Sequence, residues 1–144
     1  MNKPQPDITQ SDRFESTRAA HRDETAEDYA EAIAQLIEQT GTARVGDLAN
    51  CMGVSHVTVT RIINRLAKEG LLTKEPRKPI FLTEAGQSLA DQCRERHEIV
   101  LAFLLAIGVE ESQAQIDAEG IEHHTSHQTL AALAELTRSL KNRK

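Results

Sequence analysis

Apolar residues recur at helical spacing along most of the chain. Within residues 26–41 one apolar stripe follows the i, i+4, i+7, i+8 pattern, and it consists of Tyr29, Ile33, Leu36 and Ile37. Gly41 then supplies a helix stop signal. The same periodicity predicts three helices in the second half of the chain, over residues 83–108, 110–124 and 126–140. The pattern therefore predicts a mainly α fold in which helices pack on helices.

Residues 44–70 carry the signals of two helices joined by a tight turn. The first helix has its apolar residues at helical spacing, and Gly53 follows it where a tight turn needs a positive φ. Ser55 is a good N-cap for the second helix, which Gly70 ends. The apolar stripe of this second helix consists of Val59, Ile62, Ile63 and Leu66. Two helices joined by a short glycine-containing turn predict a helix-turn-helix.

Residues 71–83, LLTKEPRKPIFLT, predict a short hairpin. Their tip, KEPRKP, is too rich in proline for a helix and too charged for a core. A hairpin directly after the second helix of a helix-turn-helix would be a wing. The chain is therefore expected to contain a winged helix-turn-helix domain over residues 26–84 and an all-helical domain over residues 85–144, whose last helix buries its leucines against a second subunit.

The composition narrows the class of protein further. Aromatic residues make up 3% of the 144 residues, so the core must be built from Leu, Ile, Val and Ala. Residues 1–25 are polar and rich in Pro, Gln and Ser, which predicts a flexible tail that is helical at most near its end. The chain has neither a membrane span nor the apolar region of a signal peptide. Cys51 and Cys93 are expected to be small core residues of a reduced, cytoplasmic protein.

The net charge of −5 is unevenly distributed. Residues 41–82 hold seven Lys and Arg against three Asp and Glu, a local balance of +4 that leaves −9 for the rest of the chain. Any solvated helix face is polar, but the glycine turn, the N-cap, the hairpin and this local charge together favour double-stranded DNA as the partner. The residues predicted to contact bases or phosphates are Arg44, His56, Val57, Thr58, Thr60, Arg61, Asn64, Arg65, Lys68, Lys74, Arg77 and Lys78.

Residues 117–128, DAEGIEHHTSHQ, gather carboxylates and imidazoles without a single Lys or Arg. Their spacing puts three side chains on adjacent parts of one helical face, namely Glu119, Glu122 and His123. Asp28 and Glu31 lie three residues apart on the first helix, away from its apolar stripe. His97 lies beside the apolar run IVLAFLL, where an imidazole without a partner would be unfavourable.

Carboxylates that lack a counter-charge repel one another unless a cation neutralises them. The four carboxylates and two neutral imidazoles described above would balance two divalent cations. Their donor atoms are oxygen and nitrogen, without Cys or Met sulfur, which favours Mn²⁺ or Fe²⁺ over a structural zinc ion. Taken singly, each of these residues has a simpler structural interpretation, and His124 and His127 are assigned to the surface or to supporting contacts.

Five segments of the chain resemble the DtxR-type metal-dependent transcriptional repressors and, within that family, the manganese-responsive MntR branch. They are EDYAEAI (27–33), ARVGDLA (43–49), FLTEAGQ (81–87), RHEIV (96–100) and DAEGIEHH (117–124). The resemblance implies a winged-helix homodimer, in which metal links the DNA-binding domain to a metal-binding and dimerisation domain. It also implies Mn²⁺, with two ions per subunit, bound by Asp28, Glu31, His97, Glu119, Glu122 and His123.

The function implied by this resemblance is manganese-responsive repression of metal-ion homeostasis genes, such as those for manganese transport. Iron-responsive relatives carry Met and Cys at the positions of Asp28 and Glu122, so the residues found here point to manganese. A winged-helix regulator that responds to Fe²⁺ or to a small organic ligand stays open as an alternative. An enzyme is not expected, because di-metal carboxylate enzymes present Glu-x-x-His on two helices and this chain lacks that motif.

Overall fold

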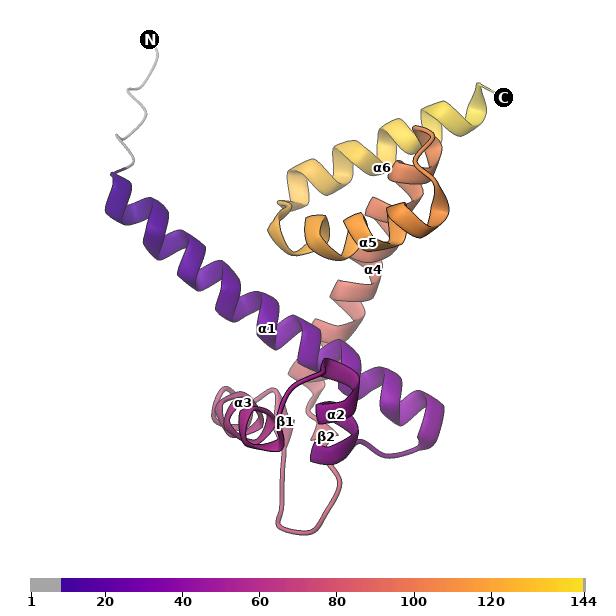
Figure 1. Cartoon of the computed structure of the whole chain (residues 1–144). Helices are drawn as coiled ribbons and strands as arrows, with labels where there is room; N and C mark the ends of the chain where they lie inside the picture. The colour runs from indigo at the N-terminus through magenta and orange to yellow at the C-terminus, as the bar shows by residue number, and fades with distance from the viewer. Residues whose placement is uncertain (1–8, 144) are drawn as a thin grey trace.

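The computed structural model describes residues 9–143. Three helices come first, namely α1 (Gln10–Thr40), α2 (Val45–Met52) and α3 (His56–Lys68). An antiparallel hairpin of β1 (Leu72–Thr73) and β2 (Phe81–Leu82) follows. The remaining elements are α4 (Glu84–Ala106), α5 (Glu111–Ile121), the 3₁₀ helix η1 (Glu122–His124) and α6 (His127–Asn142) (Figure 1). The predicted mainly α fold is confirmed, and none of the described helices is long and apolar enough to cross a membrane.

Helix α1 begins far earlier than its apolar pattern indicates. The Thr9 side chain accepts a hydrogen bond from the backbone N–H of Asp12, and the Asp12 side chain accepts one from Thr9 in return. No Gly or Pro interrupts the helix before Gly41, which has a φ of +88°. Residues 10–25 are therefore helical, which corrects the expectation of a flexible tail there; residues 1–8 lie outside the described part. Most of the described side chains in this first half of α1 are exposed, so no apolar stripe marks it.

Helices α2 and α3 form the predicted helix-turn-helix. Gly53 has a φ of +67° in the turn between them, and the Ser55 side chain accepts a hydrogen bond from the backbone N–H of Thr58 at 3.2 Å. The two helices share one core with α1. Its fully buried side chains include Ile33, Leu48, Val59, Ile63 and Leu66.

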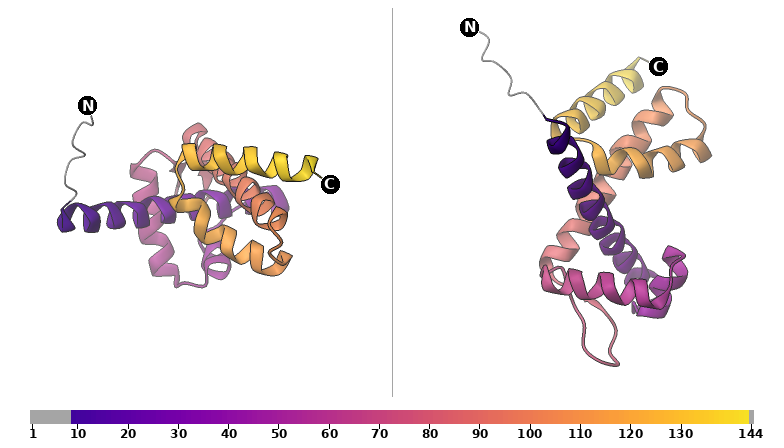
Figure 2. Two further views of the ribbon diagram at one scale, coloured as in Figure 1. Left: turned by 90° about the horizontal axis from the view of Figure 1, so that it is seen from above. Right: turned by 60° about the vertical axis from the view of Figure 1, so that its left-hand side comes forward.

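The hairpin is short but is held at both ends. Its strands have two residues each, fewer than the predicted 71–83 hairpin would allow, and Leu72 pairs with Leu82. A separate bridge between Ala43 and Ile80 joins the hairpin to the segment before α2. The loop between the strands projects away from the rest of the molecule, as a wing does (Figures 1 and 2).

Helix α4 connects the winged part to the C-terminal helices (Figure 2). At its far end it packs with α5 and α6 around a second core, which contains Val100, Leu104, Ala114, Ala118 and Leu130. Between the two cores α4 packs against α1 through buried alanines, namely Ala30, Ala34 and Ala90. Small side chains let the two helices approach closely, and this packing places the carboxylates of α1 beside η1.

The two cysteines occupy different environments. Cys93 is fully buried on α4, as expected, whereas Cys51 is exposed and the expectation of a core position is wrong for it. Leu48 and Ala49 fill the inner face of α2, so Cys51 faces outward two positions later.

Candidate metal centre

Four elements bring the predicted metal ligands to one region of the molecule. They are Asp28 and Glu31 on α1, His97 on α4, Glu119 on α5, and Glu122 and His123 on η1. The 3₁₀ helix contacts both α1 and α4, and its His123 faces the carboxylates of α1 while its Glu122 faces His97 on α4. The cluster therefore lies where the two domains meet.

One group of donors surrounds His97. Its Nδ1 atom lies 2.8 Å from Oε2 of Glu122 and 3.4 Å from Oε1 of Glu119. Its other nitrogen, Nε2, lies 3.1 Å from the side-chain oxygen of Gln115, to which it donates. This hydrogen bond fixes the ring so that Nδ1 is the atom that faces the carboxylates.

A second group surrounds His123. Its Nε2 atom lies 3.0 Å from Oδ1 of Asp28 and 3.4 Å from Oε1 of Glu122, so Glu122 touches both groups. Its Nδ1 atom donates to Oε2 of Glu27 at 2.6 Å, and the Arg96 guanidinium holds the other oxygen of Glu27 at 2.7 Å. Along this chain of contacts, the side chains of His123, Glu27 and Arg96 are largely shielded from solvent. Asp28 is about one-third exposed.

The electrostatics of the cluster favour a bound cation. Burial, reinforced by the charge of Glu119, raises the pKa of Glu122 to about 7. Burial and the charge of Glu119 also raise the pKa of Glu31. The nearby His97 acts to lower this pKa, and Asp28 acts to raise it. Hydrogen bonds to Asp28, and then to Glu27, raise the pKa of His123 to about 10. A raised pKa means that each of these groups keeps its proton to a higher pH than usual, and a bound cation would lessen the repulsion among the carboxylates in place of those protons.

One atom in particular fits a metal ligand. Oε1 of Glu122 is buried and forms no hydrogen bond, although His123 lies within ion-pair distance. A buried carboxylate oxygen without a partner is costly, and a cation would satisfy it. The donors around it are carboxylate oxygens and imidazole nitrogens, a set that suits Mn²⁺ or Fe²⁺. The residues present therefore fit a divalent metal.

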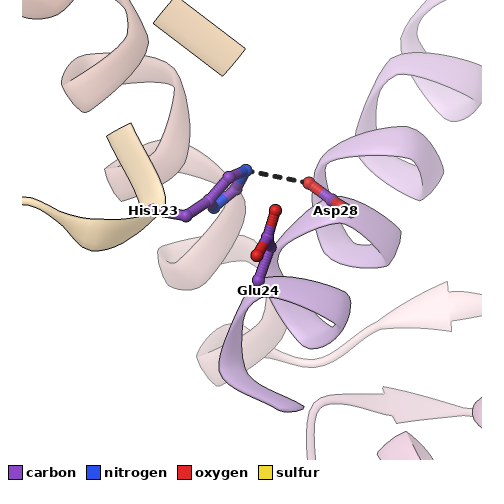
Figure 3. A group of neighbouring side chains, drawn as sticks. All are labelled: Glu24, Asp28 and His123. Atoms are coloured by element: carbon purple, nitrogen blue, oxygen red, sulfur yellow. Dashed lines mark ion pairs between the residues drawn. The ribbon is translucent and has the colours of Figure 1, made fainter. Parts of the chain in front are cut away.

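Sequence reasoning missed two members of the cluster. Glu27 contacts His123 and Arg96, which lie far along the chain, so no local signal could have identified it. Glu24 lies four residues before Asp28, and its carboxylate belongs to a group of possible metal ligands with Asp28 and His123 (Figure 3). That spacing would have put Glu24 on the same helix face as Asp28, had α1 been extended to include it. His124, assigned to the surface, contacts Glu24 at 3.2 Å.

The predicted DNA-contacting residues lie on α3, on the wing and before α2. A shallow hollow on the outer face of α3 is lined by His56, Val57, Thr60, Arg61 and Asn64. The Val57 side chain is 79% exposed there, which is unusual for an apolar residue and suits contact with a thymine methyl group. Thr58, Arg65 and Lys74 are half-buried, whereas the other four, Arg44, Lys68, Arg77 and Lys78, are exposed. The Arg65 guanidinium reaches the backbone oxygen of Arg22 on α1 and the carboxylate of Glu69.

Known proteins resemble this chain over most of its length. Residues 23–80 match the iron dependent repressor N-terminal DNA-binding domain, and residues 83–143 match the metal-binding and dimerisation domain of the same family. The transcriptional regulator MntR of Escherichia coli O157:H7 is 48% identical over 119 residues, covering 83% of this chain and 77% of the relative. The HTH-type transcriptional regulator MntR of Lysinibacillus sphaericus is 37% identical over 115 residues, with coverages of 80% and 83%.

Solved structures agree with the sequence comparison. A manganese-dependent transcriptional repressor in complex with manganese superposes with a TM-score of 0.70 at 27% identity, and the manganese regulator SloR superposes with 0.69 at 26%. Each alignment covers 78% of this chain, which spans about half the length of either solved protein. The chain therefore belongs to the iron dependent repressor family, as its motifs predict, and combines the family's DNA-binding domain with its metal-binding and dimerisation domain.

Proposed function

We propose that this protein is a manganese-responsive transcriptional repressor. As a homodimer in the cytoplasm, it would bind operator DNA when Mn²⁺ occupies the cluster at the domain junction, and so control metal-ion homeostasis genes such as those for manganese transport. The observation that carries the proposal is the buried oxygen of Glu122, which forms no hydrogen bond and lies among donors from both domains. The relatives named as manganese regulators support the choice of metal.

Two ions per subunit would use the two groups of donors. His97, Glu119 and Glu122 form one group, Asp28 and His123 form the core of the other, and the charge of Glu31 acts on both. All the ligands are oxygen or nitrogen, which supports Mn²⁺ while leaving Fe²⁺ as the alternative ion. A bound cation would supply the positive charge that lets these carboxylates remain ionised together.

The residues of the cluster would act by holding the two domains in one arrangement. Asp28 and Glu31 belong to the helix that packs on the helix-turn-helix, whereas Glu119, Glu122 and His123 belong to the C-terminal domain. Because these ligands from the two domains would hold one metal site, they would fix the position of α3 in one subunit relative to α3 in the partner subunit. The effect is a shift of population with a coupling of roughly 1–3 kcal/mol, so operator DNA must in turn tighten metal binding.

Helix α3 would contact the bases of the DNA, and the wing would contact the DNA beside them. Thr58, Thr60 and Arg61, near the start of α3, are best placed for base edges. Arg44, Arg65 and Lys68 would contact the phosphate backbone, and the wing residues Lys74, Arg77 and Lys78 would contact the adjacent backbone or the minor groove. The Arg65 guanidinium lies 3.5 Å from the carboxylate of Glu69, which would compete with a phosphate for it.

Dimerisation would use the outer face of α4 and α6. Leu105 and Leu136 are 42% and 48% exposed, although each belongs to a helix with an apolar stripe. Leu105 lines a hollow between the two helices together with Ala102, Ala106, Leu140 and Lys141. A second subunit would remove this apolar surface from water.

The test is DNA binding by Glu122→Ala and His123→Ala variants, measured with Mn²⁺ and with chelator at one salt concentration. Both variants are expected to remain folded dimers and to lose the Mn²⁺ response. Glu98→Ala, an exposed carboxylate beside His97 on α4, is the matched control and should respond as the wild type does. A full Mn²⁺ response in both cluster variants would contradict the proposed function.

A further inference from the structure

The N-terminal extension of α1 brings one more carboxylate to the cluster. Glu24 lies one helical turn before Asp28 on the same face of α1, and its carboxylate points into the space between Asp28 and His123 (Figure 3). Each of the three side chains offers a donor atom, and these atoms lie within 4.8 Å of one another. The Glu24 side chain is 28% exposed, so it is partly withdrawn from solvent.

The two groups of donors are unequal without this residue. The group around His97 contains one imidazole and two carboxylates, from Glu119 and Glu122, whose donor atoms also lie within 4.8 Å of one another. Asp28 and His123 provide one imidazole and one carboxylate of their own, and Glu122, which belongs to the first group, lies 3.4 Å from His123. Glu24 supplies a second carboxylate that the second group does not share with the first.

The other contacts of Glu24 hold its carboxylate in place. Its Oε2 atom lies 3.2 Å from Nε2 of His124 and 3.8 Å from Nδ1 of His21. These two rings pack edge to face, with their centres 6.4 Å apart. Within residues 9–143, no ion pair joins Glu24 to a Lys or Arg, so no fixed cation neutralises it.

We propose that Glu24 is a seventh metal ligand and completes the cation position formed by Asp28 and His123. The inference rests on the proposed function, because it assumes that the cluster binds a divalent ion. Six ligands were expected from the sequence, and none of them lies in the part of α1 that precedes residue 26. The extended helix would therefore contribute directly to the metal site rather than only to the surface.

The test is a Mn²⁺ titration of the full chain, in which free Mn²⁺ is followed by its electron paramagnetic resonance signal. Glu24→Gln keeps the size and helix preference of the side chain but removes its charge. We expect one of the two bound ions to be weakened by about tenfold or more, the loss typical even of outer partners in metal sites. Glu15→Gln, an exposed change on the same helix, should titrate as the wild type does. A Glu24→Gln titration that coincides with the wild type would overturn the inference.

A second variant separates ligation from a supporting role. If Glu24 only holds His124, then His124→Ala should weaken Mn²⁺ binding as much as Glu24→Gln does, and that result would also overturn the inference. Ligation by Glu24 predicts a clearly smaller loss for His124→Ala. Failure of the wild type to bind Mn²⁺ at all would overturn the proposed function and this inference together, whereas an unchanged Glu24→Gln variant of a Mn²⁺-binding protein overturns this inference alone.

Discussion

His123 is held from both sides of its ring. Nδ1 donates to the carboxylate of Glu27, which leaves Nε2 to face Asp28 and Glu122. Carboxylates that hold the far nitrogen of a metal-binding histidine fix its orientation and raise its basicity. Arg96 in turn fixes Glu27 through a 2.7 Å ion pair, in which both side chains are less than one-fifth exposed. A contact between α1 and α4 thus orients a side chain of η1.

The Glu27→Gln substitution tests this support. We expect the affinity for Mn²⁺ to fall by about 10–100-fold, because His123 loses its charged partner. The free energy of unfolding of the apoprotein should fall by roughly 1–3 kcal/mol, since Arg96 is left without a counter-charge. Metal titration and urea unfolding in chelator measure the two effects. Glu38→Gln is the matched control, because its ion pair with Arg94 joins the same two helices on the exposed surface, and such pairs contribute at most about 1 kcal/mol. Equal effects of the two substitutions would contradict the assigned role.

The two cysteines should differ in reactivity. Burial raises the pKa of the Cys93 thiol to about 11, so at any pH below that value it forms less of the reactive thiolate than an ordinary thiol. Cys51 is exposed on α2. Iodoacetamide at pH 8 is therefore expected to alkylate Cys51 first and Cys93 only after unfolding, as peptide mass mapping would show. Alkylation of both thiols at one rate in the folded protein would be inconsistent with a buried Cys93.

At the scale of whole elements, the apolar pattern predicted the helices that have a buried stripe. The stripe of α3, with Val59, Ile63 and Leu66, marks it clearly, and so do the glycines at its two ends. The first half of α1 was missed because it is exposed on most sides and needs no apolar residues. Its start depends instead on the capping pair of Thr9 and Asp12, which the expectation of a polar tail obscured. Glu24 was missed for the same reason.

The junction between the wing and α4 depends on a glycine. A Cβ atom on Gly86 would lie 1.9 Å from the backbone oxygen of Leu71, so the backbone would have to move. We expect Gly86→Ala to reduce the free energy of unfolding by about 1–3 kcal/mol or more. Gly120→Ala is the control, because nothing lies within 4 Å of its Cβ position and alanine favours a helix by up to about 1 kcal/mol. Urea unfolding in chelator compares them, and a neutral Gly86→Ala would mean that the wing does not pack on α4 as described.

The wing offers a test of phosphate contact. Arg77 lies at its tip with a φ of +65°, a conformation that asparagine also adopts readily. Arg77→Asn therefore removes the charge without straining the turn. We expect the slope of log binding constant against log salt concentration to decrease by about 1, with similar weakening on all DNA sequences. An unchanged slope would exclude a phosphate contact at this position.

At the scale of the whole molecule, the part proposed to bind DNA and the part proposed to bind metal differ in net charge. The local balance of +4 over residues 41–82 belongs to the helix-turn-helix and wing, whereas the acidic remainder holds the donor cluster. The types and local spacing of the donors could be predicted from sequence, since the residues of each short motif lie within a few positions of one another, on one helix or on the adjoining α5 and η1. Their division into two groups could not be predicted, because it depends on how α1 packs against α4 and η1. Glu122, which touches both groups, shows this dependence most directly.

The most direct test of the central claim is enrichment of binding sites from a random pool of DNA duplexes. One selection would contain Mn²⁺ and the other a chelator, at one near-physiological salt concentration, because phosphate contacts alone respond strongly to salt. We predict that a palindromic site is recovered with Mn²⁺ and not with chelator, as a metal-dependent dimer requires. Recovery of the same site in the presence of chelator would contradict metal control of DNA binding.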